Sequence, residues 1–246
     1  MARPVQAAMM PGMKIVPALL AAAALTACSA TSERPRVLRP AANPSEVIAA
    51  ELAFARTARE KGTWTAFRQY ATRDAQWPGP QWENVQAALK DAPDPAQAIV
   101  WQPDQVWSSC DGSFALSTGP ATYPDGKRTR FATIWQRQDN GDYRWVLDQG
   151  VDLEGGYAAP EMISAGVADC PAGRANRVAR VPKARRAAAW AAGQSDDGTL
   201  TWNTELRADC SRTLVVSAMQ GGAMREVFRR VAAAPAVPAG GAPASC

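Results

Sequence analysis

The chain of 246 residues contains no histidine. Histidine is the usual general base at neutral pH and the commonest metal ligand, and it completes the Ser-His and Cys-His pairs of nucleophilic enzymes. Its absence excludes all of these arrangements. Because there is no C-x-x-C pair either, the sequence predicts neither a metal site nor a cofactor. Any catalysis would have to use carboxylates, tyrosine, lysine or cysteine.

The amino-terminal apolar run, Ile15–Ala24, is too short to span a bilayer, which takes about 18–20 residues. Lys14 precedes it, and Leu25-Thr26-Ala27-Cys28 follows it, which resembles the bacterial lipobox Leu-x-[Ala/Gly]-Cys. The sequence therefore predicts a lipoprotein signal peptide over residues 1–28 with a lipid on Cys28. The alternative is a plain secretory signal that happens to contain a cysteine.

Acyl chains such as palmitate on Cys28 would hold the protein to a membrane without a spanning helix. By resemblance to proteobacterial sorting rules, Ser29 in place of Asp favours the outer membrane, with the protein facing the periplasm. Loss of residues 1–27 removes Arg3 and Lys14 and lowers the net charge from +4 to +2. The composition therefore gives no reason to expect a nucleic-acid partner.

Residues 29–44 contain three prolines and no apolar period, which is typical of a tether. We expect Ser45 to cap a first helix that Gly62 ends. Its predicted apolar side, at 3.6-residue spacing, comprises Val47, Ile48, Leu52, Ala55 and Arg59, with Phe54 and Ala58 beside them. A second helix over 64–72, a short strand over 74–77 and a third helix over 82–89 are expected next.

Residues 98–150 contain four apolar, tryptophan-rich runs separated by turn residues. The turn signals are Cys110-Asp111-Gly112, Pro124-Asp125-Gly126 and the segment 139–142. This alternation predicts an antiparallel meander of four strands.

The segments IAAELAFARTAREKGTWTAFRQYATRDAQW and VWSSCDGSFALSTGP…GKRTRFATIWQRQDNGDYRWVLDQG resemble the nuclear-transport-factor-2-like superfamily, in particular its SnoaL-like domains of unknown function. The resemblance covers about residues 45–150 and departs near Trp77–Trp82, where the family has a longer segment with another strand. It implies an α+β fold over 45–152, with three N-terminal helices packed on a curved antiparallel sheet that forms a cone. The open end of such a cone is often a ligand pocket, and homodimers through the sheet are common.

Residues 153–186 are predicted to form a linker with a basic segment, 187–231 a small all-β meander, and 232–246 a disordered tail. Between Arg174 and Arg186 lie six positive charges and no negative one. A solvated connector is the simpler interpretation. The alternative is a contact with an anionic envelope component.

Four cysteines remain if Cys28 is lipidated, and four cysteines allow three pairings. Cys170 and Cys210 flank the predicted C-terminal meander, so we expect a disulfide between them. Cys246 could then reach Cys110 or stay free.

Four residues are candidates for acid–base chemistry: Asp74, Asp148, Tyr70 and Tyr123. By resemblance, ketosteroid isomerase places an Asp base and a Tyr/Asp oxyanion pair inside its cone. Strict alternation along the last strand puts Asp148 on the face of Arg144 and Val146, so Asp148 is inside only if that face is inside. Each candidate also has a structural interpretation, as a cap or ion-pair partner for the acids and as a core residue for the tyrosines.

Tryptophans could line an apolar pocket or simply fill the core of the cone. The candidates are Trp64, Trp77, Trp101, Trp107 and Trp135. We favour a non-catalytic protein that binds a small apolar ligand or an envelope partner. The alternative is a cofactor-free isomerase or dehydratase, which requires at least two of the four acid–base candidates in one cavity and a carboxyl there with a raised pKa. A purely structural protein predicts a cone filled by tryptophan.

Overall fold

The computed structural model describes residues 42–78, 82–153, 157–158, 160–170 and 191–234. All of them belong to one compact unit, Arg39–Cys246. The predicted signal peptide with Cys28, the basic segment Arg174–Arg186 and most of the predicted tail lie outside the described residues. No helix in the described part of the chain is long and apolar enough to cross a membrane.

Two consecutive helices, α1 (Pro44–Lys61) and α2 (Thr63–Tyr70), form one layer of the domain. The N-cap of α1 is Asn43 rather than the predicted Ser45, because the Asn43 side chain accepts a hydrogen bond from the Ser45 backbone N–H at 3.2 Å. Gly62, with a positive φ of 112°, ends α1 as predicted and lets α2 start at once.

The face of α1 that packs on the sheet differs from the predicted one. Leu52 is 43% exposed, whereas Glu51, beside it in the sequence, is fully buried. Glu51 lies on the same face of α1 as Val47, Phe54 and the other buried residues of this helix. The prediction grouped residues at 3.6-residue spacing and so placed Leu52 on this face.

The segment predicted as a third helix begins as a strand. β1 (Ala71–Pro78) pairs antiparallel with β2 (Trp82–Asn84), and only a single helical turn follows, α3 (Val85–Ala88). The Asn84 side chain caps this turn by accepting a hydrogen bond from the Ala87 backbone N–H at 2.9 Å.

The large sheet contains the predicted meander, but it is not purely antiparallel. Its further strands are β3 (Val100–Trp101), β4 (Gln105–Ser108), β5 (Phe114–Thr122), β6 (Arg128–Arg137), β7 (Tyr143–Asp152) and β8 (Ser164–Val167). The strand order is β2-β1-β7-β6-β5-β4-β8, with β3 paired to β5. β1 pairs in parallel with β7, and β8 pairs in parallel with β4. Parallel neighbours cannot be joined by a tight hairpin, so in each pair the two strands are linked by a longer stretch of chain. β8 lies in the stretch predicted to be a linker.

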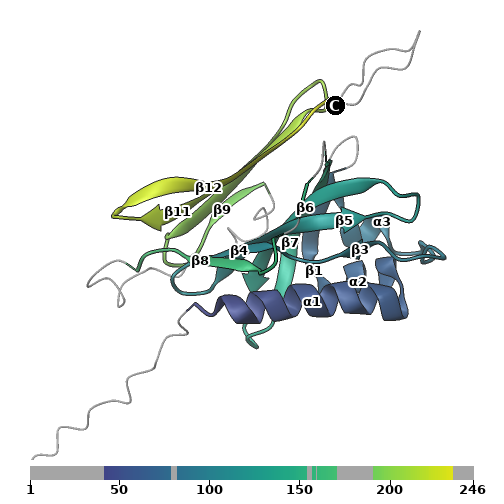
Figure 1. The fold of residues 1–246 in the computed structure, drawn as a ribbon, viewed down its shortest axis with the longest axis horizontal. Helices are drawn as coiled ribbons and strands as arrows, with labels where there is room; N and C mark the ends of the chain where they lie inside the picture. The colour runs from purple at the N-terminus through teal and green to yellow at the C-terminus, as the bar shows by residue number, and fades with distance from the viewer. Residues whose placement is uncertain (1–41, 79–81, 154–156, 159, 171–190, 235–246) are drawn as a thin grey trace, which may run out of the picture. The chain divides into compact units, whose positions relative to one another are not determined.

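A second sheet contains β9 (Ala192–Gln194), β10 (Leu200–Leu206), β11 (Arg212–Gln220) and β12 (Ala223–Ala232) in that order. The helices cover one face of the large sheet, here called the inner face, and the second sheet packs on the other, the outer face (Figure 1). A shared apolar core joins the two sheets. It includes Leu116, Ile134 and Leu147 from the large sheet, and Leu200, Leu214 and Val216 from the small one.

The disulfide joins Cys110 to Cys170, so the predicted Cys170–Cys210 pairing is wrong. The parallel pairing of β8 with β4 brings Ser108 opposite Val167, which leaves the two cysteines just beyond neighbouring strand ends with their Cα atoms 5.2 Å apart. This approach depends on β8, a strand that the sequence did not reveal. Cys210 is also disulfide-bonded.

Candidate functional site

A β-bulge in β7 turns Asp148 toward the inner face of the sheet. Ile134 pairs with Leu147 and Trp135 with Trp145, so Val146 is an extra residue between them. Val146 and Leu147 both pack in the core between the sheets, while Trp145 packs against the helices. The predicted grouping of Asp148 with Arg144 and Val146 is therefore wrong, since strict alternation does not survive a bulge.

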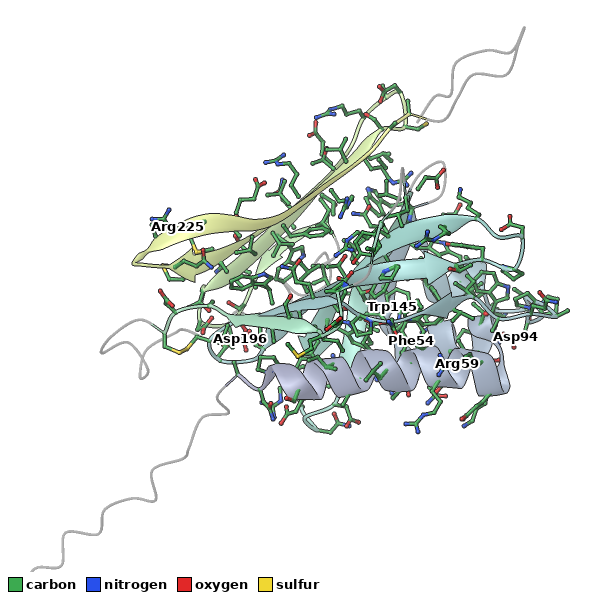
Figure 2. The ribbon with its side chains drawn as sticks, in the orientation of Figure 1. Phe54, Arg59, Asp94, Trp145, Asp196 and Arg225 are labelled. Carbon is green, nitrogen blue, oxygen red and sulfur yellow. A yellow bond between two sulfur atoms is a disulfide. The ribbon has the colours of Figure 1, made fainter. Side chains whose placement is uncertain are left out.

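Asp148 lines a small cavity between α1, α2 and the inner face of the sheet. Phe54, Phe67, Ile99, Trp101, Ala121 and Phe131 form its apolar walls, and Glu51, Tyr123, Thr129, Thr133, Asp148 and Gly150 complete the lining. The cavity volume is ≈ 30 Å³, which is room for about two water molecules. Figure 2 shows Phe54 and Trp145 in the densely packed region between α1 and the sheet.

The environment of Asp148 favours the protonated form of its carboxyl. Burial raises the pKa of Asp148 to about 7, the hydrogen bond from Thr133 opposes this, and the charge of Glu51 adds to it. Thr133 Oγ1 donates to Asp148 Oδ1 at 2.7 Å, across the β6–β7 ladder. The group is half-buried and can exchange protons with whatever occupies the cavity.

Tyr123 brings a hydroxyl to the same cavity from the β5–β6 turn. Burial, followed by the charge of Asp148, raises the pKa of Tyr123, so its hydroxyl stays protonated. A Cβ placed on Gly150 would lie 3.8 Å from the Tyr123 hydroxyl and 3.4 Å from Thr129 Oγ1, so the two hydroxyls converge over this glycine. Thr129 Oγ1 is buried and makes no hydrogen bond with good geometry among the described residues.

Glu51 is a site residue that the sequence prediction missed. Its carboxyl accepts hydrogen bonds from Trp101 Nε1 at 2.7 Å, from Trp135 Nε1 at 3.0 Å and from Ser117 Oγ at 2.5 Å. Burial raises the pKa of Glu51, and these three hydrogen bonds oppose the rise. The signal was present, because Glu51 interrupts an otherwise apolar stripe at 47, 54, 55 and 58.

The remaining acid–base candidates lie elsewhere. Asp74 is exposed on β1. Tyr70 packs its ring 5.2 Å from that of Phe54, and its hydroxyl lies 3.3 Å from Thr57 Oγ1. It lines a separate groove of ≈ 490 Å³ together with Glu46, Ala49, Ala50, Gln69, Gly141, Asp142, Tyr143 and Arg144.

Of the five predicted tryptophans, only Trp101 lines the cavity. Trp135 is fully buried behind it, where it donates to Glu51. Trp64 and Trp77 pack edge to face against each other with ring centroids 5.6 Å apart. Trp107 lies on the outer face, against Gly166 of β8 and the core between the sheets. The tryptophans therefore act mainly as core residues.

The site combines a proton acceptor active near neutral pH, a neutral hydroxyl donor and apolar walls. Asp148 and Tyr123 satisfy the condition set for an enzyme, namely two of the four candidates in one cavity and a carboxyl with a raised pKa. The described lining contains no cysteine or lysine that could act as a nucleophile. Proton exchange and hydrogen bonding are the chemistry that these residues can perform.

No protein-family model and no curated protein sequence matches the chain. Among solved structures, an NTF2-like protein of unknown function from Shewanella baltica is similar over 46% of this chain and 98% of its own, with 11% identity and a TM-score of 0.36. ActVI-ORFA from Streptomyces coelicolor matches over 44% and 95%, with 15% identity and a TM-score of 0.33. Nuclear transport factor 2 from Cryptosporidium parvum matches over 45% and 95%, with 12% identity and a TM-score of 0.33.

The described residues themselves form the predicted α+β arrangement with a large sheet. The neighbours do not establish the superfamily, which stays a prediction from the sequence. At such identities and TM-scores they say nothing about the ligand or reaction of this chain.

Proposed function

We propose that the cavity between the helices and the large sheet binds a small, mainly apolar molecule through one polar group. The observation that carries this proposal is that Asp148 and Tyr123 meet in one cavity whose other walls are mostly apolar. Binding sites for small molecules commonly combine apolar walls with a few convergent polar groups of perturbed pKa. A ligand oxygen would receive a hydrogen bond from Tyr123 and from the protonated form of Asp148.

The size of the cavity limits what enters without rearrangement. A volume of ≈ 30 Å³ accommodates a group of two or three heavy atoms, so a larger ligand requires aromatic walls such as Phe67 and Trp101 to move aside. Trp101 is therefore an internal probe of binding, since its indole forms part of the wall.

Native mass spectrometry of the chain without residues 1–28 tests for binding. All described residues are retained in this form. We expect a small mass that co-purifies with the protein and is lost on denaturation, or saturable quenching of tryptophan fluorescence by a probe such as phenol. Gly150→Val, which fills the space beneath the two hydroxyls, should abolish both signals. If the Val variant and the unchanged chain bind equally, the cavity is not the binding site.

A second function, proton transfer without a cofactor, is favoured by one specific observation: the pKa of Asp148 is about 7, beside a protonated tyrosine. Such a pair can remove a proton α to a carbonyl while the hydroxyl stabilises the developing oxyanion. We expect α-hydrogen exchange of cyclohexanone in D2O to be accelerated by the chain. Asp148→Asn should abolish the acceleration, and Tyr123→Phe should reduce it by about 10²–10³-fold. Equal rates for all three proteins would exclude this function.

We also propose that the protein is a lipoprotein of the outer membrane, facing the periplasm, anchored through Cys28. The support is the lipobox-like order Leu25-Thr26-Ala27-Cys28 behind a short apolar run, with Ser29 next. Metabolic labelling with palmitate in a Gram-negative host should label the chain, and Cys28→Ser should remove the label. Labelling that survives Cys28→Ser would contradict this assignment. Contact of Arg174–Arg186 with an anionic envelope component stays a prediction.

A further inference from the structure

The strands β9–β12 repeat the strands β4–β7. Both sets form meanders with the same neighbour order. The first hairpin of each set encloses six residues: Ser108 pairs with Ala115, and Gln194 pairs with Thr201. The enclosed sequences are Ser-Cys-Asp-Gly-Ser-Phe at 109–114 and Ser-Asp-Asp-Gly-Thr-Leu at 195–200.

The two turns are held by the same hydrogen bonds. In the first, Asp111 Oδ1 accepts from Ser109 Oγ at 2.7 Å, from Ser113 Oγ at 2.8 Å and from Ser113 N at 2.9 Å. The second turn repeats these bonds around Asp197 Oδ1, at 2.6, 2.8 and 3.0 Å. A glycine with positive φ follows the central aspartate in each, at Gly112 and Gly198.

The last hairpin of each set carries a bulge at the same place. In the large sheet the register shifts after Ile134, and Val146 is the extra residue. In the small sheet the shift follows Val216, and the extra residue is again a valine, Val227. Counted along the ladders from the first turns, Ile134 and Val216 occupy the same position. A shared bulge in a shared register is hard to obtain from two unrelated hairpins.

The two sets contact each other reciprocally. Cys110 N donates to Thr199 Oγ1 at 2.9 Å, and Asp196 N donates to Ser113 Oγ at 2.9 Å. Each bond joins the second residue of one turn to the fifth residue of the other. Reciprocal contacts between equivalent residues are the mark of a two-fold relation.

The apolar core between the sheets has the same symmetry. Equivalent positions from the two sets lie together in it: Phe114 and Leu200, Leu116 and Trp202, Ile134 and Val216, Leu147 and Phe228. The ring centroids of Phe114 and Trp202 are 4.5 Å apart. The core is therefore built as an interface between two copies of one unit.

We infer that β9–β12 is a second copy of β4–β7 that docks on the first about a local two-fold axis. The second copy covers the outer face of the large sheet, through which two chains could otherwise associate. The occupant of the outer face is thus the chain's own β9–β12. No described helix packs on the second copy, so the cavity of Asp148 and Tyr123 is present once. On this inference an internal pseudo-dimer takes the place of the homodimer through the sheet that the family resemblance implies.

Light scattering on the chain without residues 1–28 tests this inference. We expect a single-chain mass for the unchanged protein. Val216→Glu puts a charge into the fully buried interface and should undock β9–β12, so that the exposed outer face associates into dimers or larger species. The matched control is Val231→Glu, a 52%-exposed valine of the same sheet, which should stay monomeric. A dimeric unchanged protein, or a monomeric Val216→Glu with unaltered Tm, would overturn the inference.

A milder pair of variants tests the two-fold relation if Val216→Glu does not fold. Ser113→Ala and Thr199→Ala each remove one reciprocal bond and one equivalent bond within a turn. A two-fold relation predicts that each lowers Tm by a similar amount, about 2–4 °C per hydrogen bond lost. The inference fails if only one of the two variants lowers Tm.

Discussion

Glu51 of α1 and Asp148 of β7 line the same cavity from opposite layers of the domain. The charge of Glu51 contributes to the raised pKa of Asp148, after burial itself. Two carboxyls in one poorly solvated region cannot both ionise at low cost, so protonation of one affects the other. This coupling gives the site its dependence on pH.

Asp148→Asn should stabilise the protein above pH 7. The pKa of Asp148 is raised from 3.8 to about 7, so between these values the folded state binds more protons than the unfolded state. Stability therefore falls as pH rises through this window. A neutral Asn keeps the acceptor for Thr133 and removes the buried charge. The rise of the pKa from 3.8 to about 7 sets an upper limit of about 4 kcal/mol, and we expect a gain of about 1–2 kcal/mol at pH 8.

Urea unfolding of Asp148→Asn and the unchanged chain at pH 5 and pH 8 measures this effect. Asp152→Asn, an exposed position on the same strand, is the control and should change stability little at either pH. If the difference in the free energy of unfolding between Asp148→Asn and the unchanged chain is the same at pH 5 and pH 8, Asp148 does not titrate between these pH values.

Replacement of Glu51 should destabilise the core. In Glu51→Leu the buried donors Trp101 Nε1 and Ser117 Oγ lose their acceptor, whereas Trp135 Nε1 keeps its hydrogen bond to Ser117 Oγ at 2.8 Å, so the cost is at least roughly 2 kcal/mol. Glu51→Gln keeps the size and one acceptor oxygen and should cost about 1–3 kcal/mol. Exposed Leu52 provides the neighbouring control: Leu52→Gln should alter the free energy of unfolding by less than about 0.5 kcal/mol. Equal stability of Glu51→Leu and Leu52→Gln would contradict the structure.

Glu51→Gln should also lower the pKa of Asp148, because it removes one of the charges that raise it. An NMR titration of the Asp148 carboxyl carbon measures this directly. An unchanged midpoint would show that the two carboxyls are not coupled.

Gly150 controls access to the polar end of the cavity. Gly150→Ala adds a Cβ at ordinary contact distance, 3.4 Å from Thr129 Oγ1, and should leave stability within about 1 kcal/mol of the unchanged chain. Gly150→Val should exclude a ligand while the strand remains formed. Circular dichroism checks folding, and fluorescence titration checks binding. Retained binding in a folded Gly150→Val would place the ligand elsewhere, for example in the groove of ≈ 490 Å³.

Peptide mapping under non-reducing conditions should yield a cross-linked pair that contains Cys110 and Cys170. The bond closes a loop with a sequence separation of 60, so Cys110→Ala with Cys170→Ala should cost up to about 4 kcal/mol by the chain-entropy relation. Reduced, unchanged protein also loses the disulfide of Cys210, so it should be destabilised at least as much as the double variant. A cross-linked peptide that pairs Cys170 with Cys210 would refute the assigned connectivity.

Local sequence signals predicted much of the architecture. Gly62 ends α1, and the turns at 110–112, 124–126 and 139–142 separate the strands of the meander, because these residues constrain the backbone locally. Tyr123 was a candidate by chemical type, and Asp148 also through the resemblance to ketosteroid isomerase. The single acid within the apolar stripe of α1 was also visible, and a helical wheel centred on Phe54 would have identified Glu51.

What the sequence alone determined is therefore the first two helices and the hairpins of the meander, since each depends on residues close together in the chain. Tertiary structure decided which side chains meet. The bulge at Val146 re-aims Asp148, the parallel pairing of β8 with β4 brings Cys170 to Cys110, and packing buries Glu51 rather than Leu52. Each outcome depends on contacts between distant segments, whose free energies no local pattern encodes.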